Sequence, residues 1–122
     1  MWNARLLAGL ASLSLFNHAA FAAAAEFPSK PLRYISASGP GGASDLIART
    51  IGAAMSEVLG VPIVIDNRPG AGNTIGAELA SRAVPDGYTI FGCNIASLAV
   101  APALYRKLGY DPDRDFVITA AR

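Results

Sequence analysis

The stretch that decides the fold is Ser38-Gly39-Pro40-Gly41-Gly42-Ala43-Ser44-Asp45. A strand-like run, 32–37, leads into it, and a run with apolar residues at helical spacing, 46–59, leads out. Its glycines leave the main chain open to close approach. The first turn of the following helix carries free N–H groups and the positive end of the helix dipole, which attract a carboxylate or phosphate. The stretch therefore predicts a strand, a glycine turn and a helix start. It either holds a small anion or is a tight connection capped by Ser44 or Asp45.

The composition is that of a globular protein. Of the 122 residues 52% are hydrophobic and 16% charged, and the formal net charge is +1. This balance gives no basis for holding nucleic acid by charge, so no nucleic-acid partner is predicted. The sole cysteine, Cys93, excludes an intrachain disulfide, and its apolar neighbours predict a buried thiol in a strand.

The first 25 residues differ in kind from the rest. Arg5 gives a short basic start, 6–16 is apolar, and a small-residue end leads to Ala25. This is the pattern of a cleaved secretory signal peptide, and the apolar part is shorter than the roughly 20 residues that span a bilayer. Residues 26–122 are then expected to fold as one modest domain.

Strand-like and helix-like segments alternate along the rest of the chain. A mostly β-branched strand over 61–66 is predicted at or near the centre of a sheet. A second glycine-rich loop, 67–74, leads into a second helix, and a third strand covers 88–93. Beyond the loop 94–97, we expect a short helix from Pro102 that ends at Gly109, with Leu104, Tyr105 and Leu108 as its apolar face. The aromatic and β-branched run 116–119 predicts a fourth strand.

This alternation is typical of an α/β fold with a parallel sheet and helices on its faces. In such sheets, ligands gather beyond the carboxyl ends of the strands. The loops after the first three predicted strands all belong to that edge. Three glycine-rich or small polar loops at one edge predict a ligand site more specifically than any one of them.

Several segments, in this order and spacing, resemble the substrate-binding proteins of tripartite tricarboxylate transporters, also called Bug-type periplasmic receptors. They are Gly39–Asp45, Asn67-Arg68-Pro69-Gly70-Ala71-Gly72, Ile75–Glu78, Pro85-Asp86-Gly87-Tyr88-Thr89 and Pro102–Tyr105. The resemblance implies a lobe of a Venus-flytrap receptor, similar to type II periplasmic binding proteins. Such a receptor binds a small organic carboxylate in the periplasm and delivers it to the permease subunits of a membrane transporter.

The resemblance also implies which residues grip the carboxylate, mainly through main-chain N–H groups. The ligand-binding residues carried over are Gly41, Gly42, Ala43, Ser44, Asp45, Gly72, Asn73, Thr74, Asn94 and Ser97. Asp45 has two interpretations: a first-turn residue that favours the helix dipole, or an acceptor for a ligand hydroxyl, amine or water. Arg68 is interpreted as a structural ion pair or carbonyl contact and is left out of the site.

Three departures from the family pattern are visible. In the second loop, Gly72-Asn73-Thr74 stands where a further glycine before Asn is common. The family usually has an aromatic residue and prolines before the glycines, where this chain has Ser36-Ala37-Ser38. Family members are also much longer, so residues 26–122 are expected to be part of the first lobe, with the second lobe absent and the chain truncated. A lobe of this kind is expected to expose a sheet edge and apolar faces.

Other functions fit the sequence less well. The only histidine, His18, lies in the segment expected to be cleaved, so neither a Ser-His-Asp arrangement nor a metal site is predicted, and we expect no enzyme activity and no cofactor. The run 70–76 resembles a dinucleotide-binding fingerprint, which leaves a nucleotide-binding domain as one alternative. A fragment that docks on an intact receptor or permease is the other.

Overall fold

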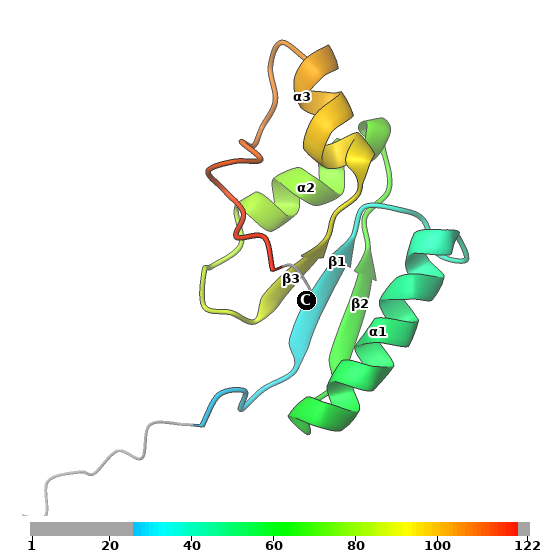
Figure 1. Ribbon diagram of the computed structural model, residues 1–122, viewed down its shortest axis with the longest axis vertical. Helices are drawn as coiled ribbons and strands as arrows, with labels where there is room; N and C mark the ends of the chain where they lie inside the picture. Colours follow the sequence, from blue (N-terminus) through cyan, green and yellow to red (C-terminus); the bar gives the residue numbers. More distant parts are fainter. Residues whose placement is uncertain (1–25, 120–122) are drawn as a thin grey trace, which may run out of the picture.

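A parallel sheet forms the centre of the molecule. The computed structural model describes residues 26–119 (Figure 1), in which strands β1 (Leu32–Ser36), β2 (Ile63–Asn67) and β3 (Thr89–Gly92) make a three-stranded sheet in the order β2-β1-β3. β1 pairs parallel with both neighbours, in a register that sets Ser36 opposite Asn67 and opposite Gly92. The α/β parallel architecture predicted from the sequence is confirmed.

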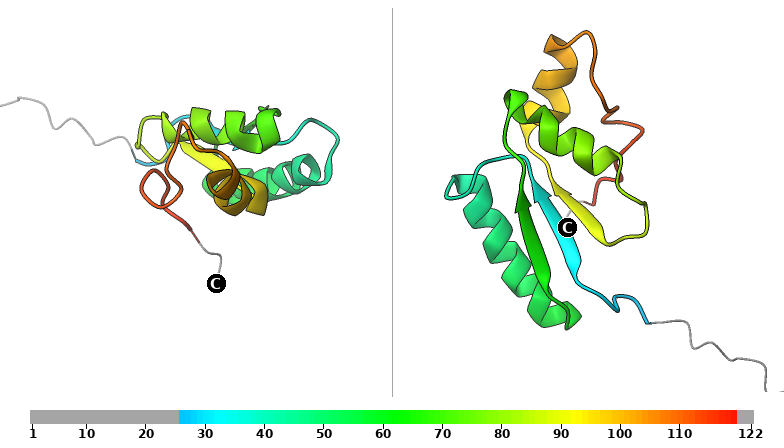
Figure 2. Two further views of the ribbon diagram at one scale, coloured as in Figure 1. Left: turned by 90° about the horizontal axis from the view of Figure 1, so that it is seen from above. Right: turned by 180° about the vertical axis from the view of Figure 1, so that it is seen from behind.

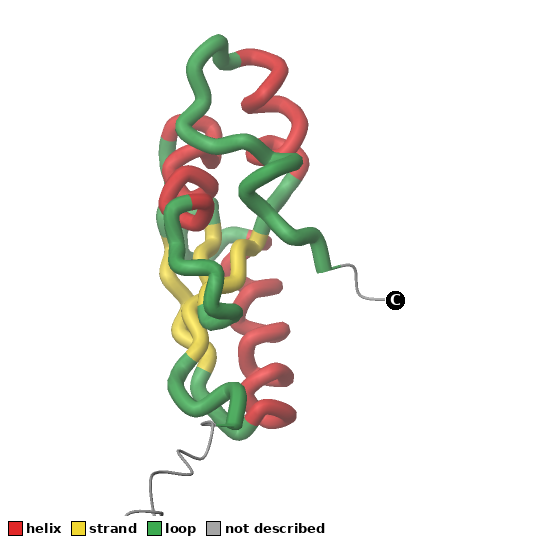
Figure 3. Tube along the Cα trace, turned by 90° about the vertical axis from the view of Figure 1, so that its left-hand side faces the viewer, coloured by secondary structure: helices red, strands yellow, loops and turns green. Residues whose placement is uncertain are grey.

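Two helices cover opposite faces of this sheet. Helix α1 (Ala43–Leu59) lies on one face and helix α2 (Thr74–Ser81) on the other, as the views in Figure 2 show. Gly60 ends α1 in a left-handed conformation with φ +69°, and its N–H donates to the oxygen of Ser56 at 3.0 Å. The two layers of helix around one sheet are also visible from the side in Figure 3.

The core is small and built largely from small side chains. Gly52 lets α1 approach the sheet, since a Cβ there would lie 3.2 Å from the Ile65 side chain. On the other face, Ala77 of α2 is fully buried. The buried apolar residues of the described chain are Leu32, Ile35, Ala37, Ala48, Ala77, Ala101 and Tyr110. Within residues 26–119, no helix has both the length and the apolar character that crossing a membrane requires.

The third helical segment begins earlier than the sequence predicted. A π-helical turn, η2 (Ala96–Val100), runs directly into α3 (Ala101–Leu104), so the segment does not start at Pro102. It also ends at Leu104, which is 72% exposed, and not at Gly109. The predicted apolar face of Leu104, Tyr105 and Leu108 was therefore wrong. The early start follows from reciprocal hydrogen bonds at the loop before the turn, described below.

Two expectations about the sheet were also wrong. Within the sheet of residues 26–119, β2 is an edge strand because β1 holds the centre, and Val64 is 54% exposed. Residues 116–119 form no strand: Phe116 stacks on Phe91 at 5.3 Å between ring centroids, but Val117 and Ile118 are 92% and 75% exposed. These residues have high β propensity, but they pair with no strand of the described sheet, so β3 lies at its edge.

The cysteine expectation was wrong as well. Cys93 is exposed, because β3 ends at Gly92 and the thiol belongs to the loop that follows. The predicted signal peptide, residues 1–25, lies outside the described residues.

Candidate functional site

The loops that follow the three strands lie at one edge of the sheet. All strand pairs are parallel, and the chain leaves β1, β2 and β3 at mutually opposite residues, Ser36, Asn67 and Gly92. The expectation that the three flagged loops share one edge is confirmed. We call this edge, with the loops 37–42, 68–73 and 93–95, the carboxyl rim.

The loop after β1 is organised by Asp45. The Asp45 carboxylate accepts hydrogen bonds from the Gly41 N–H at 2.9 Å and from Arg49 Nε at 3.0 Å, and the residue is only 4% exposed. Arg49 and then the Gly41 N–H lower the pKa of Asp45 to about 2. Asp45 lies in the first turn of α1, as its structural interpretation predicted, and it ties the loop to the helix, which was not predicted. Its role in ligand binding stays a prediction. Its Oδ1 is buried and has no hydrogen-bond partner among the described residues.

The geometry of this loop decides which N–H groups stay open. Gly42 is the N-cap of α1 in an extended conformation, with φ −82° and ψ 171°. Ala43 and Ser44 are therefore the first two residues of the helix, and their N–H groups precede the intrahelical ladder. Ala43 is exposed and Ser44 is half-buried. The Gly41 N–H is already bound to Asp45, so the open donors belong to the start of α1 itself.

The loop after β2 runs through four consecutive residues with positive φ. Gly70, Ala71, Gly72 and Asn73 have φ of 126°, 45°, 63° and 72°. Glycine and asparagine adopt such angles at little cost, whereas Ala71 is strained there. Asn73 N–H donates to the Gly70 oxygen at 2.9 Å, and Thr74 Oγ1 donates to the Ala71 oxygen at 2.9 Å. This tight turn, η1 (Ala71–Asn73), leads straight into α2.

The loop after β3 is closed on itself. The Ser97 N–H donates to Asn94 Oδ1 at 3.0 Å, and Ser97 Oγ lies 3.2 Å from the Asn94 nitrogen and 3.0 Å from its oxygen. Ser97 is fully buried, and its main-chain oxygen accepts the hydroxyl of the buried Tyr110. The side chains of Asn94 and Ser97 are hydrogen-bonded to each other, and these bonds hold the chain in position for the start of η2 at Ala96.

Direct contacts join the loops of the rim. Asn67 Nδ2 donates to the Ser38 oxygen at 3.1 Å, and the Arg68 N–H donates to the Ser36 oxygen at 2.7 Å. The turn η1 also packs against η2. The structure thus brings the first predicted loop to the second, and the second to the third.

Of the two contacts considered for the Arg68 side chain, an ion pair or a carbonyl contact, the structure shows the ion pair. Its Nε lies 2.7 Å from Asp66 Oδ1, while Arg33 binds the other carboxylate oxygen through Nε at 2.9 Å. Burial pushes the pKa of Asp66 up, but the hydrogen bonds and charges of Arg33 and Arg68 outweigh it and hold that pKa below its usual value. Arg68 therefore stabilises the start of the second loop through its ion pair with Asp66.

Sequence reasoning missed Tyr105 as a residue of the rim. The hydroxyl of Tyr105 lies 3.4 Å from the position that a Cβ on Gly72 would occupy, so the phenol stands over the second loop. The only sequence signal was the segment Pro102–Tyr105, which carries the family resemblance but says nothing of this contact across loops.

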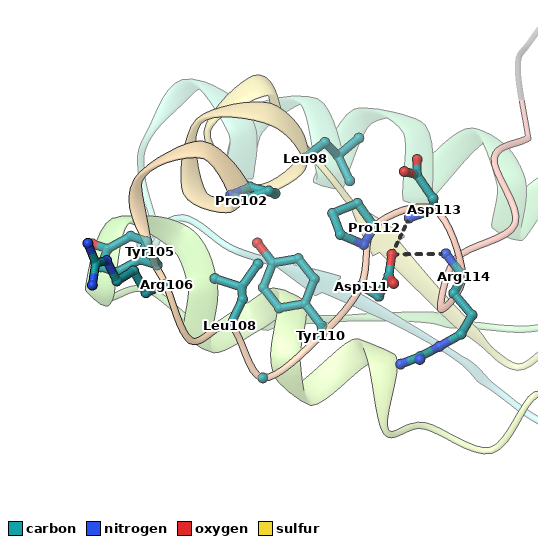
Figure 4. Close-up of a pocket in the computed structure, with 11 residues that line it drawn as sticks. Leu98, Pro102, Tyr105, Arg106, Leu108, Tyr110, Asp111, Pro112, Asp113 and Arg114 are labelled. Atoms are coloured by element: carbon teal, nitrogen blue, oxygen red, sulfur yellow. Dashed lines mark hydrogen bonds between the residues drawn. The ribbon is translucent and has the colours of Figure 1, made fainter.

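A shallow cavity of about 560 Å³ lies between α3 and the segment that follows it (Figure 4). Tyr105 and Arg106 lie at one end of it, and Asp111 at the other accepts hydrogen bonds from the N–H groups of Asp113 and Arg114 at 3.0 and 3.3 Å. None of the ten predicted ligand-binding residues lines this cavity. Among residues 26–119, no group of three or more His, Cys, Asp or Glu side chains is placed to hold a metal ion.

A parallel α/β unit whose glycine-rich loops and helix N-termini line one edge of the sheet is typical of a ligand-binding lobe of the periplasmic binding protein class. Residues 47–121 match the family described as the tripartite tricarboxylate transporter family receptor, and the chain belongs to this family. It is a family of binding receptors and not of enzymes, which confirms the expectation that the chain is not an enzyme.

Relatives with known sequences and structures agree with this assignment. A UPF0065 protein of Bordetella pertussis is 42% identical over 108 residues, which are 88% of this chain and 33% of that protein. The solved periplasmic binding protein BugD is 36% identical with a TM-score of 0.67, over 74% of this chain and 30% of BugD.

Two solved structures from Rhodopseudomonas palustris are similar and hold ligands. MatC, with bound malate, is 40% identical with a TM-score of 0.70, over 74% of this chain and 31% of MatC. A second protein, with adipate, is 34% identical with a TM-score of 0.69, over 72% of this chain and 29% of that protein. The chain thus spans about a third of the length of the curated relatives that it matches.

Proposed function

We propose that this chain supplies the carboxylate-binding rim of a periplasmic solute receptor, which captures a small organic carboxylate for a tripartite tricarboxylate-type membrane transporter. The observation that carries the proposal is the convergence of the three loops at one edge of a parallel sheet. Support comes from family membership and from the similarity to proteins solved with malate and adipate. The permease subunits of such a transporter are the proposed membrane partners.

The proposed grip uses main-chain donors. The open N–H groups of Ala43 and Ser44 lie at the positive end of the 17-residue helix α1, where a carboxylate is stabilised by both hydrogen bonds and the dipole. In the second loop the proposed donor is the Gly72 N–H, while Asn73 and Thr74 shape the turn, since their N–H groups already bind the oxygens of Gly70 and Ala71. Gly41, Gly42 and Asp45 shape the first loop, and Asn94 and Ser97 fix the start of the third.

Proline at position 43 gives a sharp test of the main-chain grip. Ala43 is the first residue of α1, where proline is tolerated, and the extended Gly42 before it suits a proline neighbour. Ala43→Pro therefore deletes one N–H donor and leaves the helix in place. Ala43→Ser is the matched control, because it changes the side chain and keeps the N–H.

Titration calorimetry on the full 122-residue chain measures the outcome. The parent and Ala43→Ser are expected to bind malate or adipate but not their neutral dimethyl esters. Ala43→Pro is expected to bind about tenfold more weakly, which is the scale of one hydrogen bond to a charged group. Equal heat from the esters, or heat from NAD alone, would contradict the proposal, as would unchanged affinity of Ala43→Pro.

A further inference from the structure

Tyr105 stands where the helical segment after β3 meets the loop after β2. Its N–H still donates to the Ala101 oxygen at 2.9 Å, but its backbone is extended, with φ −98° and ψ 122°, so the chain leaves α3 at this residue. The phenol hydroxyl then lies 3.4 Å from the Cβ position of Gly72. The phenol hydroxyl at the end of α3 thus lies over the backbone of the second loop of the rim.

The hydroxyl of Tyr105 is free to bind something else. Among the described residues it has no hydrogen-bond partner, and the side chain belongs to a residue that is 47% exposed. Tyr110 and Tyr88 differ: the hydroxyl of Tyr110 is bound to the Ser97 oxygen, and that of Tyr88 receives the Ser29 N–H at 2.9 Å. The hydroxyls of Tyr110 and Tyr88 thus stabilise the fold through hydrogen bonds, and the hydroxyl of Tyr105 does not.

Position 72 is suited to this neighbour. Gly72 has φ +63°, an angle that a side chain disfavours, and even a methyl group there would meet the Tyr105 hydroxyl in van der Waals contact. The bare backbone lets the phenol hydroxyl lie close beside the Gly72 main chain. The N–H groups of Asn73 and Thr74 are bound to the oxygens of Gly70 and Ala71, whereas the Gly72 N–H has no hydrogen-bond partner among the described residues. A carboxylate oxygen beside the phenol can therefore accept from the Tyr105 hydroxyl and from the Gly72 N–H.

We propose that Tyr105 is a ligand-contacting residue of the carboxyl rim. Its hydroxyl donates a hydrogen bond to the carboxylate held by the second loop, and its ring covers the adjoining carbon chain of the ligand. This inference rests on the proposed function and adds a ligand-contacting residue to the same site. The ring also supplies an aromatic wall to a rim whose first loop, at Ser36-Ala37-Ser38, has none.

Tyr105→Phe separates the hydroxyl from the ring, and Tyr105→Ala removes both. Leu104→Ala is the matched control, because Leu104 is the preceding residue and is 72% exposed. With malate and adipate as probes on the full chain, Tyr105→Phe is expected to weaken both affinities about tenfold. Tyr105→Ala is expected to weaken adipate further than malate, because adipate has the longer carbon chain to cover. Leu104→Ala is expected to leave both unchanged.

Amide chemical shifts give a second measurement. In the parent, the signals of Gly72, Asn73 and Thr74 are expected to move on adding malate, with smaller movement in Tyr105→Phe. If the parent binds and Tyr105→Phe binds equally well, with the same shifts, the role of Tyr105 is overturned and the proposed function stands. If the parent binds neither probe, both are overturned. A thermal melt of each variant that matches the parent shows that the fold is kept.

Discussion

Gly76, in the first turn of α2, lies directly against Ala37, the residue that follows β1. A Cβ placed on Gly76 would lie 2.9 Å from the Cα of Ala37 and 3.2 Å from the main-chain oxygen of Arg68. Both of these atoms belong to the backbone, so neither can rotate away. The missing side chain at position 76 therefore sets how closely the second helix and its loop approach the first strand at the rim.

Gly76→Ala is expected to destabilise the fold by about 1–2 kcal/mol. Overpacking at a backbone contact costs about 1–3 kcal/mol, and the better helix propensity of alanine returns up to about 1 kcal/mol. Gly39→Ala is the control, because a Cβ there meets nothing within 4 Å. Denaturant unfolding of both variants checks this, and equal stabilities would show that α2 shifts freely.

Asp45→Asn is expected to change how stability depends on pH. The folded pKa of Asp45 is about 2, below its ordinary 3.8. The carboxylate therefore stabilises the fold above about pH 4, and this contribution is lost as the pH falls toward 2. The asparagine side chain of the variant has no charge to lose, so the stability gap between parent and variant should be widest at pH 7 and shrink below pH 4.

The control for this titration is Asp113→Asn. Asp113 is exposed and belongs to no ion pair of the described chain. The other aspartates with lowered pKa values, Asp66, Asp86 and Asp115, titrate in parent and variants alike and cancel in the difference. Unfolding curves at pH 7, 4 and 2.5 supply the data. If the difference in free energy of unfolding between the parent and Asp45→Asn stays constant with pH, the Asp45 carboxylate does not stabilise the fold in this way.

Local signals in the sequence were enough to predict the elements whose ends are marked by glycine. Gly42 and Gly60 bound α1, and the strands end close to where the glycine loops begin. The shared rim followed from the alternation alone, because parallel strands all end at one edge. The N-terminal donors of the candidate site were predictable for the same reason.

The position of β2 and the contact of Tyr105 depended on partners distant in sequence, whereas the start of the third helical segment depended on local hydrogen bonds. The β-branched run of β2 has the same pattern at a sheet edge as at its centre, and only the pairing of β1 with both neighbours decides between them. Pro102 predicted a helix start, but the reciprocal hydrogen bonds of Asn94 and Ser97 start the helical segment earlier in the chain. The contact of Tyr105 with Gly72 joins two loops and has no local signature.

Arg68→Ala is expected to cost about 1 kcal/mol of stability. Arg68 and Arg33 share Asp66, whose side chain is 20% exposed, so the pair belongs to a partly buried network. Arg82→Ala, which breaks an exposed pair with Glu78 on α2, is the control and should cost about 0.5 kcal/mol or less. Chemical denaturation gives both values. A smaller loss of unfolding free energy for Arg68→Ala than for Arg82→Ala would contradict a stabilising role of Arg68.

Ser97→Ala is expected to destabilise the fold by about 1–2 kcal/mol. The Ser97 hydroxyl is fully buried and lies within 3.3 Å of three atoms of Asn94, its nitrogen, its oxygen and Oδ1. Alanine removes the hydroxyl and leaves polar atoms of Asn94 without that partner, which is the costly way to lose a hydrogen bond.

Ser81→Ala is the matched control for this loss. Ser81 is only half-buried, and its hydroxyl donates to the Glu78 oxygen at 2.9 Å inside α2. Such a bond back along a helix adds little, and alanine is the better helix former, so this variant should change stability by less than about 0.5 kcal/mol. If thermal unfolding ranks the two substitutions in the opposite order, then Asn94 and not Ser97 starts the helical segment that carries Tyr105 to the rim.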